Sequence, residues 1–266
     1  MIMKKTFAAL VVLFAASAAP SFAQTVSDLE PDFRGRLSVG TDIKLMKGFH
    51  LDVQEEFRFK NSFSQVDRSY TKIGLSYKFN NYIKAGAGYG AIFDYKPNKK
   101  TWKMLNRVYA EVTGMYKTRT WTFSLREKFQ LTNVGSHNEY ESPANKLALK
   151  SRLQAKYRGF RAPVNPYVLF EARTALNDPR LSATYNKTDG EYTSFDLLGY
   201  DDAYFNRYRG GIGFDWKMSL RSALDVYFLL DYVTDKEIDV KGTELKTLEY
   251  SRGLNSIIGL GYTISF

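Results

Sequence analysis

The chain has 266 residues, no cysteine, 15% aromatic residues and a formal net charge of +10. The lack of cysteine excludes disulfide bonds and thiolate metal sites, and beyond the first 23 residues no apolar run reaches the roughly 18 residues that a spanning helix needs. The length fits one all-β domain, since barrels commonly reach about 200–250 residues. Basic residues alternate along the chain rather than cluster, which argues against nucleic-acid binding despite the positive charge.

The N-terminal residues have the pattern of a secretory signal peptide. Lys4 and Lys5 precede an apolar run, and Ser21-Phe22-Ala23 has the small-x-small form of a cleavage site. We therefore expect export of the protein. The expected division of the chain is a signal peptide at 1–23, a short N-terminal segment at 24–33 and a barrel at 34–266.

Eleven later segments of about 10–14 residues alternate apolar and polar side chains, which is the pattern of strands with one face toward hydrocarbon and one toward a wet interior. The first, for example, places Leu37 and Val39 on one face and Arg36 and Ser38 on the other. The segments are 34–45, 49–60, 69–79, 82–95, 104–116, 121–132, 146–157, 166–174, 204–216, 222–233 and a last one that contains 254–266.

The connections between these segments alternate in length. Short turns follow the odd-numbered segments, and longer loops follow the even-numbered ones: 61–68, 96–103, 133–145, 175–203 and 234–245. Bacterial outer-membrane barrels have short periplasmic turns and longer outer loops. The pattern therefore predicts an all-β transmembrane antiparallel up-and-down barrel of about 10–12 strands. Loop 175–203 is the longest, and long loops are commonly functional, so it is the best candidate for closing the mouth or binding a partner.

An odd number of strands is unusual, because single-chain bacterial barrels usually have an even number. Three explanations are open for the eleven segments: a short strand within 24–33, an error in one assignment, or a segment 24–33 that threads the interior.

The final strand ends on an aromatic residue. Its apolar face carries Tyr262, Ile264 and Phe266, which resembles the closing strand that bacterial outer-membrane barrels present to their assembly machinery. We predict these three residues as the assembly signal.

The inward positions of the strands carry many charges, with an excess of bases. Two interpretations are open: an ion-pair network across strands, or a track for small anionic solutes whose selectivity comes from like charges. Glu56 and Arg58, and likewise Glu171 and Arg173, place opposite charges two residues apart on the inward face. The candidate residues are Glu56, Arg58, Lys72, Arg107, Glu111, Arg126, Lys128, Lys150, Arg152, Glu171, Arg173, Arg207 and Arg209.

Two acidic residues break the alternation. Glu55 and Glu127 fall on the predicted lipid face, where a charge is unfavourable. Either a β-bulge turns each side chain inward, or each lies near a membrane boundary and stays solvated.

Several short motifs resemble the DUF2490 family of predicted bacterial outer-membrane proteins. They are the leader, Glu56-x-Arg58, the Gly-rich 85–90, Asn165-Pro166-Tyr167 before Glu171-Ala172-Arg173, and Gly259-Leu260-Gly261-Tyr262. The resemblance covers nearly all of the mature chain and implies a barrel in the outer membrane. It implies no activity, because the function of the family is undefined.

We expect no catalysis, cofactor or metal site. A hydrolase would need a histidine beside a serine nucleophile, and the only histidines are His50 and His137. The sequence thus predicts a small outer-membrane channel with a net-basic lumen that favours anionic solutes. The alternatives are a closed barrel that acts through its long loops and a lipid-modifying enzyme. The expected partners are outer-membrane lipid and lipopolysaccharide, the barrel assembly machinery and a small anionic solute.

Overall fold

The computed structural model describes residues 26–97, 100–135, 137–186, 188, 191–241 and 244–266. The predicted signal peptide lies outside these residues. The described part of the chain forms twelve β-strands, and it contains no helix that is long and apolar enough to cross a membrane.

The strands follow one another with few residues between them. Their bounds are β1 Val26–Asp28, β2 Phe33–Met46, β3 Phe49–Lys60, β4 Gln65–Lys78, β5 Ile83–Lys96, β6 Thr101–Lys117, β7 Trp121–Asn133, β8 Asn145–Tyr157, β9 Val164–Asn186, β10 Glu191–Lys217, β11 Ser222–Lys241 and β12 Glu244–Ser265.

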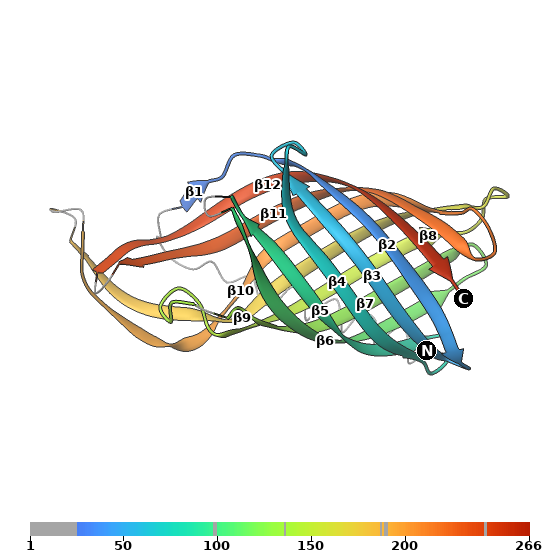
Figure 1. Ribbon diagram of the computed structural model, residues 1–266, viewed down its shortest axis with the longest axis horizontal. Coiled ribbons are helices and arrows are strands. Elements are labelled where there is room, and N and C mark those ends of the chain that lie inside the picture. The colour runs from blue at the N-terminus through green and yellow to red at the C-terminus, as the bar shows by residue number, and fades with distance from the viewer. Residues whose placement is uncertain (1–25, 98–99, 136, 187, 189–190, 242–243) are drawn as a thin grey trace.

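Strands β2 to β12 pair in chain order and close into an eleven-stranded barrel (Figure 1). Consecutive strands are antiparallel, so in a set of eleven the first and the last run in the same direction. The closing pair is therefore parallel, with Phe33 opposite Ser256 and Asp42 opposite Ser265. The prediction of 10–12 strands is confirmed. The prediction of a purely antiparallel barrel is wrong at this pair, because an odd count requires one parallel junction.

The N-terminal segment contains a short strand, as one of the three explanations for 24–33 proposed. Strand β1 pairs in parallel with β12 and continues the line of β2 along it. The Asp32 carboxylate accepts hydrogen bonds from the backbone N–H groups of Asn61 and Ser62, both at 3.2 Å. These bonds join the segment to the turn that follows β3.

The two faces of the barrel wall differ in polarity. Outward side chains are apolar and exposed, among them Ile212 at 61% and Val39 at 54%. Inward side chains include buried charges, among them Glu171 at 2% and Arg209 at 4% exposed. The alternation of the sequence thus becomes an apolar outer face and a polar interior.

Glycines in β4 and β5 make room for tyrosine rings in the interior. A β-carbon on either Gly74 or Gly88 would lie 2.4 Å from the Tyr109 hydroxyl oxygen, and one on Gly90 would lie 2.3 Å from the Tyr70 ring. Real β-carbons do not approach so closely, so Gly88 and Gly90 of β5 leave room for the rings that cover them.

The two ends of the barrel differ in how far their hairpins extend. At the turn end, short turns join the strands, and the C-terminus lies there (Figure 1). At the hairpin end, β9–β10 and β11–β12 extend beyond their neighbours (left in Figure 1). The predicted loops 175–203 and 234–245 are wrong, because most of their residues belong to these two hairpins.

The extended hairpins, residues 176–203 and 234–249, are here called the two arms, and they share a hydrophobic core outside the barrel. The Tyr192 hydroxyl of one arm donates to the Leu248 carbonyl of the other at 3.3 Å, and burial raises the pKa of Tyr192. Lys236 bridges the arms through Asp202 at 2.6 Å. The core contains Ile238, Val240 and Leu245, with Tyr140, Leu181, Ala183, Tyr192, Phe195 and Leu248 packed against them.

The two outward glutamates have hydroxyl partners. Glu55 accepts hydrogen bonds from Ser69 and Thr71 on the neighbouring strand, and Glu127 accepts one from Ser151 at 2.5 Å. The strand registers run through both positions without a shift, so the β-bulge explanation is wrong. Both side chains stay on the outer face.

Candidate functional site

Inward side chains of β7 to β11 form two neighbouring rows across the barrel wall. The row nearer the turn end, called here the balanced row, mixes both signs of charge. Each member lies opposite the next on the adjacent strand: Arg126, Arg152, Glu171, Arg209 and Asp231.

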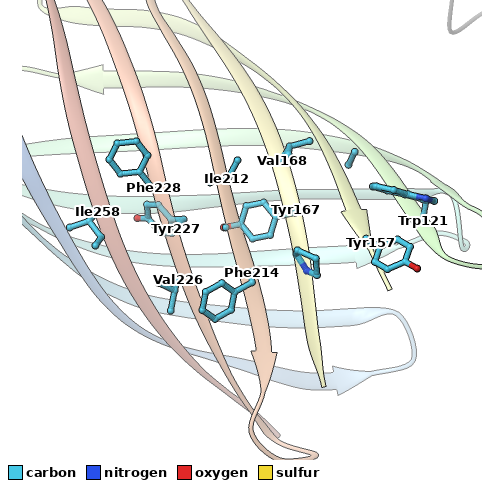
Figure 2. A pocket seen from close by; sticks show the side chains of 13 residues that line it. Trp121, Tyr157, Tyr167, Val168, Ile212, Phe214, Val226, Tyr227, Phe228 and Ile258 are labelled. Carbon is cyan, nitrogen blue, oxygen red and sulfur yellow. The ribbon is translucent and has the colours of Figure 1, made fainter. Parts of the chain in front are cut away.

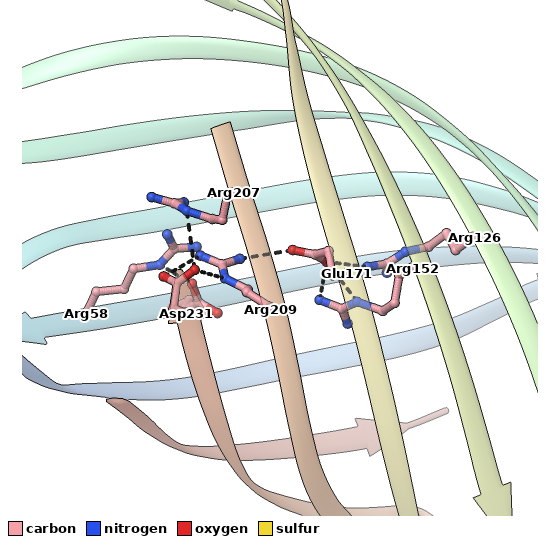
Figure 3. Close-up of polar contacts among 8 residues, drawn as sticks. Arg58, Arg126, Arg152, Glu171, Arg207, Arg209 and Asp231 are labelled. Atoms are coloured by element: carbon pink, nitrogen blue, oxygen red, sulfur yellow. Dashed lines mark hydrogen bonds and ion pairs between the residues drawn. The ribbon is translucent and has the colours of Figure 1, made fainter. Parts of the chain in front are cut away.

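The two acids of the balanced row each bind more than one guanidinium (Figure 3). Arg152 lies 2.6 Å from the Glu171 carboxylate, and Arg209 lies 3.0 Å from it on the other side. Arg209 also donates two hydrogen bonds to Asp231, at 2.9 and 3.3 Å. Bidentate charge-assisted bonds of this kind are strong and directional. Glu171, Arg209 and Asp231 are nearly inaccessible, so the row is a compensated structural network.

The next row toward the hairpin end, called here the cationic row, has one sign of charge only. Lys128, Lys150, Arg173 and Arg207 lie opposite one another on β7 to β10. Like charges directly opposite each other on paired strands are destabilising.

The two ends of the cationic row have acidic partners, and its middle has none. The Lys128 ammonium lies 2.6 Å from Glu111, and Arg207 lies 3.4 Å from Asp231. Lys150 and Arg173 form no ion pair with any described residue. The middle of the row is therefore a repulsive arrangement that cross-strand pairing does not explain.

The other side of the barrel adds a second group of arginines. Arg36, Arg58 and Arg68 lie opposite one another on β2 to β4. Arg58 pairs with Glu56 at 2.5 Å and Arg68 with Asp94 at 3.2 Å. Arg36 has no ion pair in the described part of the chain.

Two cavities lie in the interior between these walls. The hairpin-side chamber has a volume of about 200 Å³ and is lined by nine arginines and lysines but only two acids. The turn-side chamber has a volume of about 240 Å³. Both are smaller than the roughly 300–1,000 Å³ of pockets for drug-sized ligands. The charged residues of the hairpin-side chamber are Arg34, Arg36, Arg58, Asp67, Arg68, Arg107, Lys150, Arg173, Arg207, Arg209 and Asp231.

Four of the nine bases in the hairpin-side chamber have no carboxylate within ion-pair distance among the described residues: Arg36, Arg107, Lys150 and Arg173. Arg107 instead donates to the Thr132 hydroxyl at 2.8 Å and lies over the Tyr70 ring. The chamber therefore carries uncompensated positive charge.

The structure places the sequence-predicted residues together. All thirteen lie in the interior, and all except Glu111 line one or both chambers. Glu56 and Arg58 form an ion pair along one strand, whereas Glu171 pairs with Arg152 and Arg209 of the adjacent strands.

Six charged residues that line the chambers are not among the predicted candidates: Arg34, Arg36, Asp67, Arg68, Asp225 and Asp231. Alternation places Arg36 and Asp231 inward, so their signal was present in the sequence. Arg68 was assigned to loop 61–68, whereas β4 already begins at Gln65.

The predicted assembly-signal residues lie at the closing junction. Tyr262 and Ile264 are opposite Val39 and Thr41 of β2. The Phe266 backbone N–H donates to the Asp42 carbonyl at 2.9 Å. The C-terminus thus completes the parallel pair that closes the barrel.

A further cavity lies on the outer face rather than in the interior. This apolar groove of about 460 Å³ crosses β7 to β12, and its lining includes Trp121, Ile212 and Phe228 (Figure 2). No charged side chain lines it. Groups that could select a charged solute are therefore in the chambers.

One histidine makes a contact typical of hydrolases. His50 Nδ1 lies 2.7 Å from the Asp42 carboxylate near the turn end. Ser76 lies opposite His50, but its hydroxyl donates to Asp52 at 3.3 Å. Within the described residues, no serine or threonine is hydrogen bonded to His50, so the dyad has no nucleophile in place.

Comparisons with known proteins agree with the motifs in the sequence. The family model described as "Protein of unknown function (DUF2490)" matches residues 37–183, from β2 into the first arm. The match includes Glu56-x-Arg58 and Glu171-Ala172-Arg173 but ends before the closing Gly259-Leu260-Gly261-Tyr262. Searches among curated proteins and among solved structures gave no match. The chain belongs to the DUF2490 family.

Proposed function

We propose that the protein is an integral outer-membrane barrel whose narrow interior admits small anions. The observation that carries this proposal is the uncompensated positive charge of the hairpin-side chamber. Charged side chains that line a pore set its ion selectivity.

Three features support the location. The outer face is apolar and exposed over all sides of the barrel, two hairpins extend beyond the barrel at one end only (Figure 1), and the sequence begins with the pattern of a secretory signal peptide. Together these features are typical of outer-membrane barrels. On this proposal the outward face contacts lipid, and the closing strand is read by the assembly machinery.

The dimensions of the interior predict a small conductance. The two chambers share lining residues, among them Arg36, Arg107 and Lys150. Side chains therefore separate the chambers, and no wide open channel joins them. An anion would move by exchanging one guanidinium or ammonium partner for the next, which favours anions over cations.

Planar-bilayer recording of the refolded, leader-free protein tests this function. In a salt gradient we expect discrete small steps and a reversal potential on the anion side. Arg36→Gln combined with Arg107→Gln removes two uncompensated charges that line both chambers. We expect the reversal potential of this variant to move toward zero.

The matched control removes the same charge at the turn end. Lys78 and Lys84 lie opposite each other on β4 and β5, so Lys78→Gln with Lys84→Gln also removes one cross-strand pair of bases. We expect a smaller shift from this control. An unselective or cation-selective wild-type current would overturn the proposal.

The arms favour a second candidate function, a closed barrel that binds a partner at the hairpin end. A hydrophobic core outside the barrel makes them a folded element rather than loose loops. Correctly folded protein without conductance would favour this function. Deletion of 180–200 would then abolish partner binding, but it would also uncover Ile238 and Leu245, so point substitutions on the outer side of the arms are the better test.

A further inference from the structure

We propose that the hairpin-side chamber is a saturable binding site for a small multivalent oxyanion of the phosphate class. This inference rests on the proposed function for its biological setting, but binding does not require conduction.

The position of the cationic row supports a binding site rather than a general positive field. Lys150 and Arg173 are direct cross-strand partners, and Arg207 is the next residue along the row. Glu171 of the balanced row attracts the Lys150 ammonium, whereas Arg209 and Arg107 repel it. Side chains from separate strands thus bring their charges to one small volume.

The opposite wall contributes the second half of the site. Arg36 and Arg58 of β2 and β3 line the same chamber as Lys150 and Arg173 of β8 and β9. An anion between the walls would be contacted from both sides. Such an anion would add to the attraction that Glu171 exerts on Lys150 and that Asp235 exerts on Arg173.

The chemistry of the lining selects the class of ligand. Guanidinium groups bind phosphate and carboxylate oxygens with two parallel N–H···O bonds, which gives geometric as well as electrostatic preference. Four uncompensated bases match an ion with more than one negative charge better than they match chloride. The volume of about 200 Å³ limits the ligand to a small ion or a small monoester.

The neighbouring balanced row holds one lining residue of the chamber in position. Arg209 lines the chamber and is fixed by Glu171 and Asp231. These ion pairs hold the Arg209 side chain in place. Lys150 and Arg173 have no carboxylate within ion-pair distance among the described residues, so their charged groups are available to a ligand.

Isothermal titration calorimetry of the full mature protein in detergent, with inorganic phosphate as the probe at fixed ionic strength, tests the site. We expect one saturable site per chain and a much weaker response to chloride. Glycerol phosphate in a parallel titration shows whether a monoester is accepted, and binding of either compound supports the phosphate class.

Two double variants separate a defined site from general electrostatics. Lys150→Gln with Arg173→Gln should weaken phosphate binding about tenfold or more, because two ligand contacts are lost. Lys78→Gln with Lys84→Gln removes equal charge outside the chamber and should leave the affinity within about twofold. A heat-dependent shift in gel mobility verifies that each variant is folded.

Equal losses in the two variants, or no saturable binding to the folded wild-type protein, would overturn the site. The outcome is independent of the pore proposal. Phosphate binding without conductance would retain the site and remove the channel, whereas anion-selective conductance without phosphate binding would retain the channel and remove the site.

Discussion

The balanced row and the cationic row occupy adjacent inward positions on β7 to β10, yet they differ in how their charges are compensated. In the balanced row, each acid is held by two or more guanidiniums, and Glu171, Arg209 and Asp231 are buried. In the cationic row, Lys150 and Arg173 face each other without an acid. The same wall could have carried alternating charge at both positions.

The difference between the rows indicates a division between stability and function. A buried charge that is fully paired holds strands in register, and removal of one partner is costly. A row of like charges costs stability, and residues that cost stability are typical of binding sites. The comparison therefore predicts that substitutions in the two rows change stability in opposite directions.

The largest effect is expected from Glu171→Gln. This change leaves Arg152 and Arg209 without their shared carboxylate in a buried position, so we expect a loss of about 3–5 kcal/mol in the free energy of unfolding. Urea unfolding in detergent micelles measures it. Glu237→Gln in the second arm, where the side chain is exposed, is the control and should change stability by less than about 0.5 kcal/mol. A similar small change for Glu171→Gln would remove the structural role of the balanced row.

A smaller effect of the opposite sign is expected from Arg173→Glu. The new carboxylate would lie opposite Lys150 and Arg207 and would give the cationic row the charge order of its neighbour. Opposite cross-strand charges contribute roughly 0.2–1 kcal/mol each, so we expect stability to rise by about 1 kcal/mol. Bilayer recording of the same variant should show weaker anion preference. Lower stability in the folded variant would contradict the comparison.

The sequence alone predicts which charged residues face the interior, because the alternation of side chains along a strand is a local property. The period of two placed Glu56, Arg107 and Lys150 inward without knowledge of their neighbours. It also indicates eleven strand segments, from which we predict a barrel of about 10–12 strands. What alternation cannot give is the partner of each charge, because register depends on turns and on residues in other strands. For this reason the sequence alone does not identify Arg152 and Arg209 as the partners of Glu171.

The arms show a second limit of local reasoning. Residues 175–203 contain many Asp, Asn and Gly residues, which favour loops, although Leu181, Ala183 and Tyr185 alternate as in a strand. Leu181 and Ala183 pack against Ile238 and Val240 of the other arm, more than fifty residues later in the chain. Only the tertiary contact distinguishes this strand from a polar loop.

The smallest effect, and the most specific, is expected from Lys150→Gln. The change removes repulsion with Lys128 and Arg173 and breaks no ion pair, so at low salt we expect a gain of about 0.5 kcal/mol in stability. At high salt the gain in stability should shrink. The Debye length at 1 M salt is only about 3 Å, so repulsion between exposed or partly exposed charges is screened beyond that distance. Arg152→Gln, at the adjacent position on the same strand, removes the same charge from the balanced row and should destabilise at both salt concentrations. If the stability of both variants responds alike to salt, charge compensation does not distinguish the two rows. The excess of bases would then be a property of the whole barrel interior rather than of one site.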